Sequence, residues 1–141
     1  MSEKKINLES INAIGQGKLP GYLGIEVTEV ENKTISAILD IKPHHLAPNG
    51  YLHAGTVVTL ADSCAGYGCV ANLPKGASGF TTVELKSNHL GTALDGRISC
   101  IATLVHGGRT TQVWDSIVTN DTTGKTIALF RCTQMILYPR A

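Results

Sequence analysis

The order of apolar and polar positions along the chain contains one long apolar run, which extends from His53 to Asn72. This run is apolar almost all round, which is typical of a helix enclosed on most sides. It is rich in alanine and glycine, which disfavour a free helix but allow a sheet or a partner backbone to approach closely. Pro74 and Gly76 end it. We therefore expect a buried central helix over this range.

The residues before this run predict a short helix and a β-hairpin. The helix is expected over Leu8–Ile14, and the glycine-rich segment that follows it predicts a break at Pro20 and Gly21. Residues 23–31 and 35–41 are expected to be strands, joined by a turn at Asn32 and Lys33. The stretch PHHLAPNGY, with two prolines and an Asn-Gly pair, is expected to be a loop.

The residues after the run alternate in polarity and are divided by turn-forming residues. They predict four strands: Gly79–His89, Arg97–His106, Thr110–Asn120 and Lys125–Tyr138. Because no helical pattern intervenes, we expect these strands to form an antiparallel meander. The fold class is then α+β, with an antiparallel sheet curled around one long helix. We expect one domain over residues 1–141, in which residues 1–20 form the N-terminal helix and a connecting loop.

Composition and charge exclude several classes of function. The formal net charge of +1 and the absence of a basic stripe argue against nucleic-acid binding. The beginning of the chain, MSEKKINLES, lacks the apolar run of a secretory signal, and the helical run is too polar to span a membrane. The four cysteines form no CxxC pair and lie in apolar stretches, which predicts reduced thiols and a cytoplasmic protein.

Asp62 is the most informative residue, because it is the only formally charged side chain between Lys42 and Lys75. An ionised carboxylate inside an apolar helix is unfavourable unless it is paired or used in a reaction. One interpretation is a structural acid, satisfied by neighbouring hydroxyls or by a helix end across an interface. We favour a catalytic acid, since buried carboxylates are uncommon in such helices.

The start of the same helix offers backbone N–H groups to a developing oxyanion. Ala54 and Gly55 would present free N–H groups there, aided by the helix dipole. However, Gly55 and Asp62 lie about 10 Å apart along a helix that rises 1.5 Å per residue. One carbonyl group cannot easily contact both, so we expect the helix start of one chain to meet Asp62 of another. His53 either orients a carbonyl or leaving thiol, or caps the helix.

Other candidate groups are weaker. The neighbouring His44 and His45 are expected to belong to an ordinary loop, and the histidines and cysteines have no ligand spacing for a metal. Cys64 is a poor nucleophile, because an apolar setting raises the pKa of a thiol. The segment HGGRTT at residues 106–111 either binds a phosphate through Arg109 and hydroxyl groups or forms a simple turn with an exposed arginine.

With these residues in view, the chain resembles the hotdog-fold acyl-CoA thioesterases. It is most similar to the group of the phenylacetate-degradation and 4-hydroxybenzoyl-CoA thioesterases. NGYLHAGTVVTLAD resembles the family's N-x-x-G-x-x-H-G-G pattern with an acid near the middle of the helix. The segment from Gly96 to Leu137 resembles the family's closing strands in both pattern and turn placement.

The resemblance implies hydrolysis of an acyl- or aryl-CoA to a free acid and CoA, without a cofactor. Asp62 would be nucleophile or general base, the Ala54 N–H would polarise the carbonyl, and His53 would lie near the thioester. CoA would lie across subunits, its nucleotide near the turns that follow residues 86–89 and surround residues 108–110. The implied CoA-binding residues are Asn88, His89, Gly108, Arg109 and Thr110. The implied minimal active unit is a homodimer, and the implied assembly is a homotetramer.

Two positions depart from the family. Ala47 replaces a frequent Gln or Asn six residues before the histidine, so that Asn49 is the candidate to take over its role. Gly66 stands one turn after the acid, where many relatives have Ser or Thr. These losses leave two alternatives open: a hydratase or dehydratase that uses His53 and Asp62 as an acid–base pair, and a non-catalytic acyl-CoA-binding protein.

Overall fold

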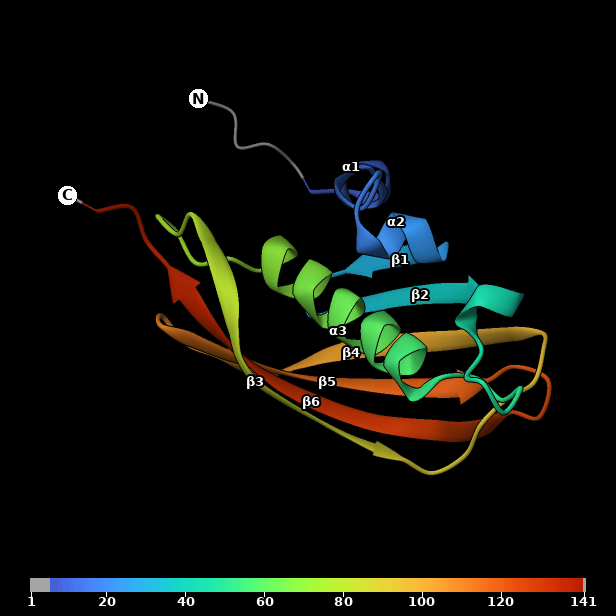
Figure 1. Cartoon of the computed structure of the whole chain (residues 1–141). Coiled ribbons are helices and arrows are strands. Elements are labelled where there is room, and N and C mark those ends of the chain that lie inside the picture. The colour runs from blue at the N-terminus through green and yellow to red at the C-terminus, as the bar shows by residue number, and fades with distance from the viewer. Residues whose placement is uncertain (1–5, 141) are drawn as a thin grey trace.

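The computed structural model describes residues 6–140, which form an antiparallel sheet curled along one long helix (Figure 1). The six strands within these residues lie in the order β1-β2-β4-β5-β6-β3. The helices are α1 (Leu8–Ile14), α2 (Leu19–Leu23) and α3 (Ala54–Ala71), with a 3-10 turn at Pro43–His45. The strands are β1 (Glu26–Glu31), β2 (Thr34–Asp40), β3 (Gly79–His89), β4 (Arg97–Gly107), β5 (Thr111–Asn120) and β6 (Lys125–Leu137).

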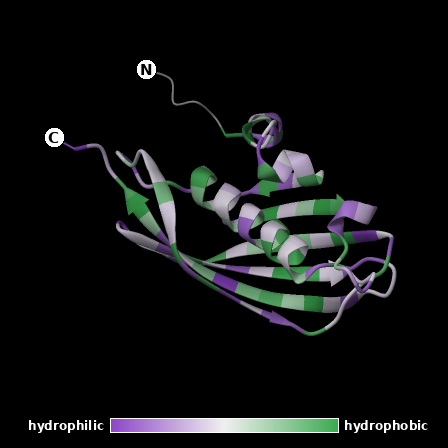
Figure 2. Cartoon of the chain, viewed as in Figure 1, coloured by the Kyte–Doolittle hydropathy of each residue, from purple (hydrophilic) through white to green (hydrophobic). Residues whose placement is uncertain are grey.

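Helix α3 packs on the concave face of the sheet because its small residues allow close contact. A Cβ atom on Gly68 would overlap the ring of Trp114, which is fully buried on β5. The Ser116 hydroxyl of β5 donates to the Ala61 carbonyl at 2.9 Å, so the sheet also bonds to the helix backbone. Figure 2 shows the alternation of apolar and polar residues along the strands beneath the helix. Among residues 6–140, no helix is long and apolar enough to cross a membrane.

Most of the predicted elements are confirmed, and two details were wrong. The second strand of the hairpin, the central helix and the last four strands lie where expected, within one residue. The predicted break at Pro20 and Gly21 is instead the short helix α2, which ends at Gly24 with φ +83°. Strand β1 therefore begins at Glu26 and not at Leu23.

The second detail is the position of β3. The last three strands form a meander as predicted, but β3 pairs with β6 and not with β4. Strand β4 pairs with β2 instead, so that the N-terminal hairpin extends the same sheet. The segment between β3 and β4 therefore connects two strands that are not adjacent in the sheet. The alternation of polarity within a strand does not predict such a connection.

Strand β3 is consequently an edge of the sheet with a free hydrogen-bonding side. Residues 81–86 on it are all exposed, among them Val83 at 56% and Leu85 at 43%. Apolar side chains are also exposed on the convex face of the sheet: Ile101, Val105, Ile117 and Leu129. A long, partly apolar edge of this kind is a surface on which another strand can pair.

Candidate active site

The start of α3 is capped by the histidine that precedes it. His53 has extended backbone torsions, and its Nδ1 accepts a hydrogen bond from the Gly55 N–H at 2.7 Å. Since Nδ1 is the acceptor, the proton of the neutral ring lies on Nε2, which faces outward as a donor. A Cβ on Gly55 would lie 2.9 Å from Nδ1, so the cap requires glycine at this position. The prediction that the Gly55 N–H is free was therefore wrong.

Ala54 provides the N–H group that remains at this helix start. Among the described residues, no acceptor lies within hydrogen-bond distance of it. The next two N–H groups, of Thr56 and Val57, donate to the His53 carbonyl. Ala54 and His53 are both exposed, and the helix dipole places partial positive charge here. The arrangement can accept one oxyanion at Ala54, with the His53 Nε2–H beside it.

His45 holds this helix start in place and was underestimated from the sequence. Its ring is fully buried, accepts from the Lys42 N–H at 2.8 Å and donates to the Leu23 carbonyl at 2.7 Å. Its carbonyl accepts from the His53 N–H at 3.0 Å and from the Thr56 hydroxyl at 2.9 Å. His45 thus ties the segment at Leu23 and Lys42 to the first turn of α3, through its ring on one side and its carbonyl on the other.

This histidine makes stability depend on pH. Burial holds the pKa of His45 below its usual 6.5, because a charged ring would be removed from water. Below that pH the unfolded chain takes up a proton before the folded chain does, so stability is complete above about pH 6.5 and falls as the pH drops. We expect the melting temperature of His45→Asn to fall less between pH 7 and pH 5 than that of the wild type. The exposed His44 provides the control, and the melting temperature of His44→Asn should fall as steeply as that of the wild type. A fall in His45→Asn as steep as in the wild type would contradict the assignment.

Asp62 lies two turns into α3, on the side that faces β6 and β3. It is half-buried, and its Oδ1 is buried without a hydrogen-bond partner among the described residues. Burial raises the pKa of this carboxyl above its ordinary value. The carboxylate also lies near Cys132 of β6, whose thiol pKa is raised to about 12 by burial and, to a smaller extent, by Asp62. An acid with an unused, partly desolvated oxygen is suited to accept a proton or attack a carbonyl.

Ser87 of β3 faces the same space and was not predicted. It is paired with Phe130 of β6, which in turn is paired with Ser116 of β5. Because Ser116 bonds to the carbonyl of Ala61, this row of the sheet lies at the level of Asp62. The Ser87 Oγ is also buried without a partner in the described part of the chain. Two unpaired polar atoms, the Asp62 Oδ1 and the Ser87 Oγ, therefore lie between α3 and β3. The alternation of polarity along β3 alone had suggested no role for Ser87.

The departure at Gly66 has a structural reason. Residue 66 lies one turn after Asp62, and a Cβ there would be 3.2 Å from the Phe80 ring of β3. The aromatic ring thus occupies the space that a serine or threonine would take. Phe80 lies beside Gly66 and Cys132 lies near Asp62 and Cys69, so the surroundings of the acid on this side are apolar.

The acid and the oxyanion donor of one chain are far apart. Ala54 and Asp62 are eight residues apart on α3, a rise of about 12 Å. A thioester carbonyl at Ala54 is therefore out of reach of Asp62 in the same chain. Asn49 does not fill the gap, because its Oδ1 accepts from the Tyr51 N–H at 3.1 Å and supports the turn before the helix.

The predicted CoA-binding residues do not form one site in a single chain. Asn88 and His89 lie at the end of β3, whereas Gly108, Arg109 and Thr110 form the β4–β5 turn at the opposite end of the sheet (Figure 1). Asn88 and His89 also point to opposite faces, since neighbours on a strand alternate. The Arg109 guanidinium lies 5.5 Å from the Tyr138 ring, beside a cavity of about 330 Å³ that Gly108 and Asn72 also line.

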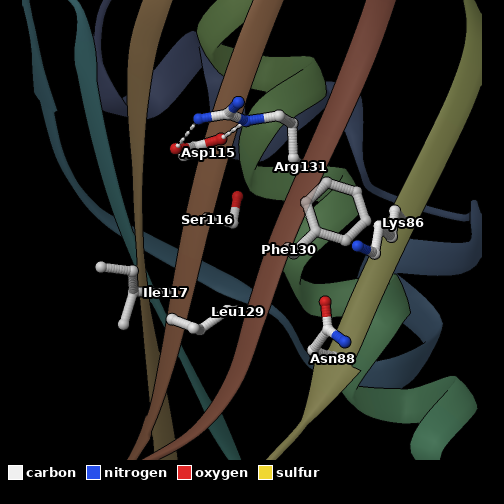
Figure 3. Close-up of a pocket in the computed structure, with 8 residues that line it drawn as sticks. All are labelled: Lys86, Asn88, Asp115, Ser116, Ile117, Leu129, Phe130 and Arg131. Atoms are coloured by element: carbon white, nitrogen blue, oxygen red, sulfur yellow. Dashed lines mark hydrogen bonds and ion pairs between the residues drawn. The ribbon is translucent and has the colours of Figure 1, made fainter.

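A second depression lies on the convex face of the sheet. Figure 3 shows Lys86 and Asn88 reaching it from β3, beside the ion pair of Asp115 with Arg131 at 2.5 and 2.8 Å. Its volume is about 330 Å³. Since Asp115 balances Arg131, the ammonium of Lys86 is the unpaired charge in this depression. In residues 6–140, no three His, Cys, Asp or Glu side chains gather in a way that could hold a metal ion.

Comparison with known proteins shows what the chain is similar to. The family model described as Thioesterase superfamily matches residues 49–127. A 1,4-dihydroxy-2-naphthoyl-CoA hydrolase from Escherichia coli K12 is 33% identical over 138 residues, covering 96% of this chain and 98% of the relative. A mutant of the thioesterase PA1618 from Pseudomonas aeruginosa has a TM-score of 0.89 at 28% identity, with 96% of each chain covered. The thioesterase HI1161 from Haemophilus influenzae has a TM-score of 0.88 at 25% identity, covering 96% of this chain and 93% of that one. The predicted hotdog fold is confirmed.

Proposed function

Since the chain belongs to the thioesterase superfamily and is a thioester hydrolase, we propose that it cleaves an acyl- or aryl-CoA to the free acid and CoA, with Asp62 as the catalytic carboxylate. The observation that carries this proposal is the Asp62 Oδ1, which is buried on an apolar helix and unpaired among the described residues. An unpaired buried carboxylate costs stability, and groups of this kind cluster at functional sites. The aryl-CoA range comes first, because the E. coli relative is named for an aromatic acyl-CoA.

In the proposed reaction the thioester carbonyl lies between the Ala54 N–H of one copy and Asp62 of another. Asp62 either accepts a proton from water as the water oxygen attacks the carbonyl carbon, or attacks that carbon itself to give an anhydride that water then cleaves. The Ala54 N–H stabilises the oxyanion. The C–S bond breaks as the carbonyl re-forms, and the thiolate takes a proton to leave as CoA. The outward Nε2–H of His53 would serve as a donor to the leaving sulfur.

A homodimer as the active unit is supported by the distance along α3 and by the exposed edge of β3. Antiparallel pairing of two β3 edges would join the two sheets and bring the two α3 helices side by side. The helix start of one copy would then approach the Asp62 region of the other. Such pairing would also cover Val83 and Leu85, which are exposed in the single chain.

Association of two dimers into a homotetramer, and a cytoplasmic location, are further parts of the proposal. The exposed apolar side chains of the convex face, Ile101 and Ile117 among them, support a second contact surface. The four cysteines are buried and free, which suits a reducing compartment. No cofactor is needed for the proposed chemistry, in which CoA enters as part of the substrate.

Release of free thiol from a panel of acyl-CoAs tests this proposal. We expect turnover that is highest for aryl-CoAs and lower for short and long aliphatic ones, with no dependence on added metal ions. Enoyl-CoAs should be cleaved or left intact, but not hydrated. Hydration without thiol release would favour the acid–base alternative, and binding without release from any member would refute hydrolysis by this chain.

A further inference from the structure

A row of polar side chains runs from the exposed edge of β3 into the core at the C-terminal end of α3. Thr82 of β3, Gln134 of β6 and Gln112 of β5 are register partners, so their side chains lie on the same face of the sheet. Gln112 and Gln134 are 1% and 0% exposed. Residues 132 and 136 on either side of Gln134 are buried apolar positions of the same face. A polar residue at a buried position of this alternation is a signal that the sequence already contains.

The two glutamines differ in how well their amides are satisfied. Gln112 is complete, because its Oε1 accepts from the Trp114 Nε1–H at 2.7 Å and its Nε2 donates to the Asn72 carbonyl at 2.8 Å. In Gln134, Oε1 accepts from the Thr82 hydroxyl at 2.8 Å, but Nε2 is buried with no acceptor among the described residues. A buried amide donor without a partner is unfavourable, because it has lost its hydrogen bond to water.

The free amide lies on the face of β6 that packs toward α3, the same face as Cys132 beside Asp62. The row of Phe130 lies at the level of Ala61 and Asp62, and Gln134 is four residues further along β6, about 14 Å at 3.4 Å per residue. Between the two levels, this face carries Cys132 of β6 and its register partner Leu85 of β3. An extended acyl group whose thioester is at Asp62 would pass these apolar side chains and end near Gln134.

We propose that Gln134 is a specificity-determining residue, whose side-chain N–H binds an oxygen at the distal end of an aryl acyl group, such as a ring hydroxyl. The inference rests on the proposed function and extends it to the substrate. Thr82 orients the amide by occupying its oxygen, which leaves the N–H for the ligand. The Gln134 N–H, which has no acceptor among the described residues, would gain one only from a substrate that carries an oxygen at this end.

Paired substrates test this role: benzoyl-CoA against 4-hydroxybenzoyl-CoA, and 2-naphthoyl-CoA against its 6-hydroxy derivative. We expect the wild type to prefer at least one hydroxylated partner by about 10- to 100-fold in kcat/KM. Gln134→Met, of similar volume but apolar, should lose this preference and keep its activity on the parent compounds. Its melting temperature should equal or exceed that of the wild type, because an unsatisfied buried donor is removed.

Gln112→Met is the matched control, since it changes the adjacent buried glutamine. It should lower the melting temperature, because the Trp114 N–H and the Asn72 carbonyl lose their partners, and it should keep the hydroxyl preference. Thr82→Val is a second variant that leaves Gln134 in place, and it should weaken the preference by releasing the amide. A wild type without preference, or a Gln134→Met enzyme that retains it, would overturn the inference while thioester hydrolysis stands. Absence of cleavage of every acyl-CoA would overturn the proposed function and the inference with it.

Discussion

Replacing Asp62 with asparagine is expected to abolish thioester hydrolysis and to leave the fold intact or more stable. Asparagine keeps the size of the side chain but can neither take a proton from water nor attack a carbonyl. Loss of a general base or nucleophile lowers kcat by about 10²- to 10⁴-fold, whereas KM should change little. Because burial raises the pKa of Asp62, the ionised carboxylate destabilises the folded state at neutral pH. Removing the charge should therefore raise the melting temperature at pH 7.

The pH profile gives a second measurement of the same group. Activity of the wild type should rise with pH through an apparent pKa above 3.8, as the Asp62 carboxyl loses its proton. Asp95→Asn is a suitable control, since Asp95 is exposed in the loop before β4 and should give wild-type rates. An Asp62→Asn enzyme with wild-type turnover would refute the mechanism, and a strongly destabilised one would indicate a structural acid instead.

Replacing Ala54 with proline is expected to lower kcat by about 10²- to 10³-fold, because it removes the proposed oxyanion donor. The fold should tolerate the change. Proline is favoured at the first position of a helix, and the ψ of 133° at His53 is compatible with a following proline. The Ala54 N–H has no acceptor within the described residues, so no internal bond is lost. Ala54→Gly, which keeps the N–H, serves as the control and should retain most of the activity.

The two variants together test whether the site is built from two chains. In a mixed dimer the Ala54→Pro chain supplies Asp62, and the Asp62→Asn chain supplies the Ala54 N–H, so one of the two sites is complete. Random mixing would restore about a quarter of wild-type activity, because half of the dimers are mixed. Activity that stays at the level of the separate variants, with mixed dimers present by mass spectrometry, would mean that each site lies within one chain.

The boundaries of the elements could be predicted from the sequence because local chemistry determines them. Asn32 and Lys33, Gly124 and Pro74 end elements through backbone preferences that hold in any context. The order of the strands could not, since β3 and β6 pair across about fifty residues and alternate in polarity like any other pair. Helix α2 was also missed, because a proline at the start of a helix and a proline in a turn give the same local pattern.

Part of the candidate site could likewise be predicted from the sequence, and part could not. Asp62 was evident as a charge in an apolar run, and its level along α3 follows from helix geometry. The cap formed by His53 on Gly55, which leaves Ala54 as the donor, depends on a side-chain torsion that composition does not determine. His45 and Gln134 become informative only when their partners are known, because one is fully bonded and the other lacks an acceptor.

The charges on the free edge of β3 also affect which strand would pair with it in the proposed homodimer. Glu84 and Lys86 flank Leu85 near the middle of this edge. When two such edges pair antiparallel about a twofold axis at Leu85, each Glu84 faces Lys86 of the other copy, and both cross-strand pairs are attractive. A shift of the axis by one residue would set glutamate against glutamate or lysine against lysine. In the proposed homodimer these two charges would favour one register of self-pairing over misaligned association.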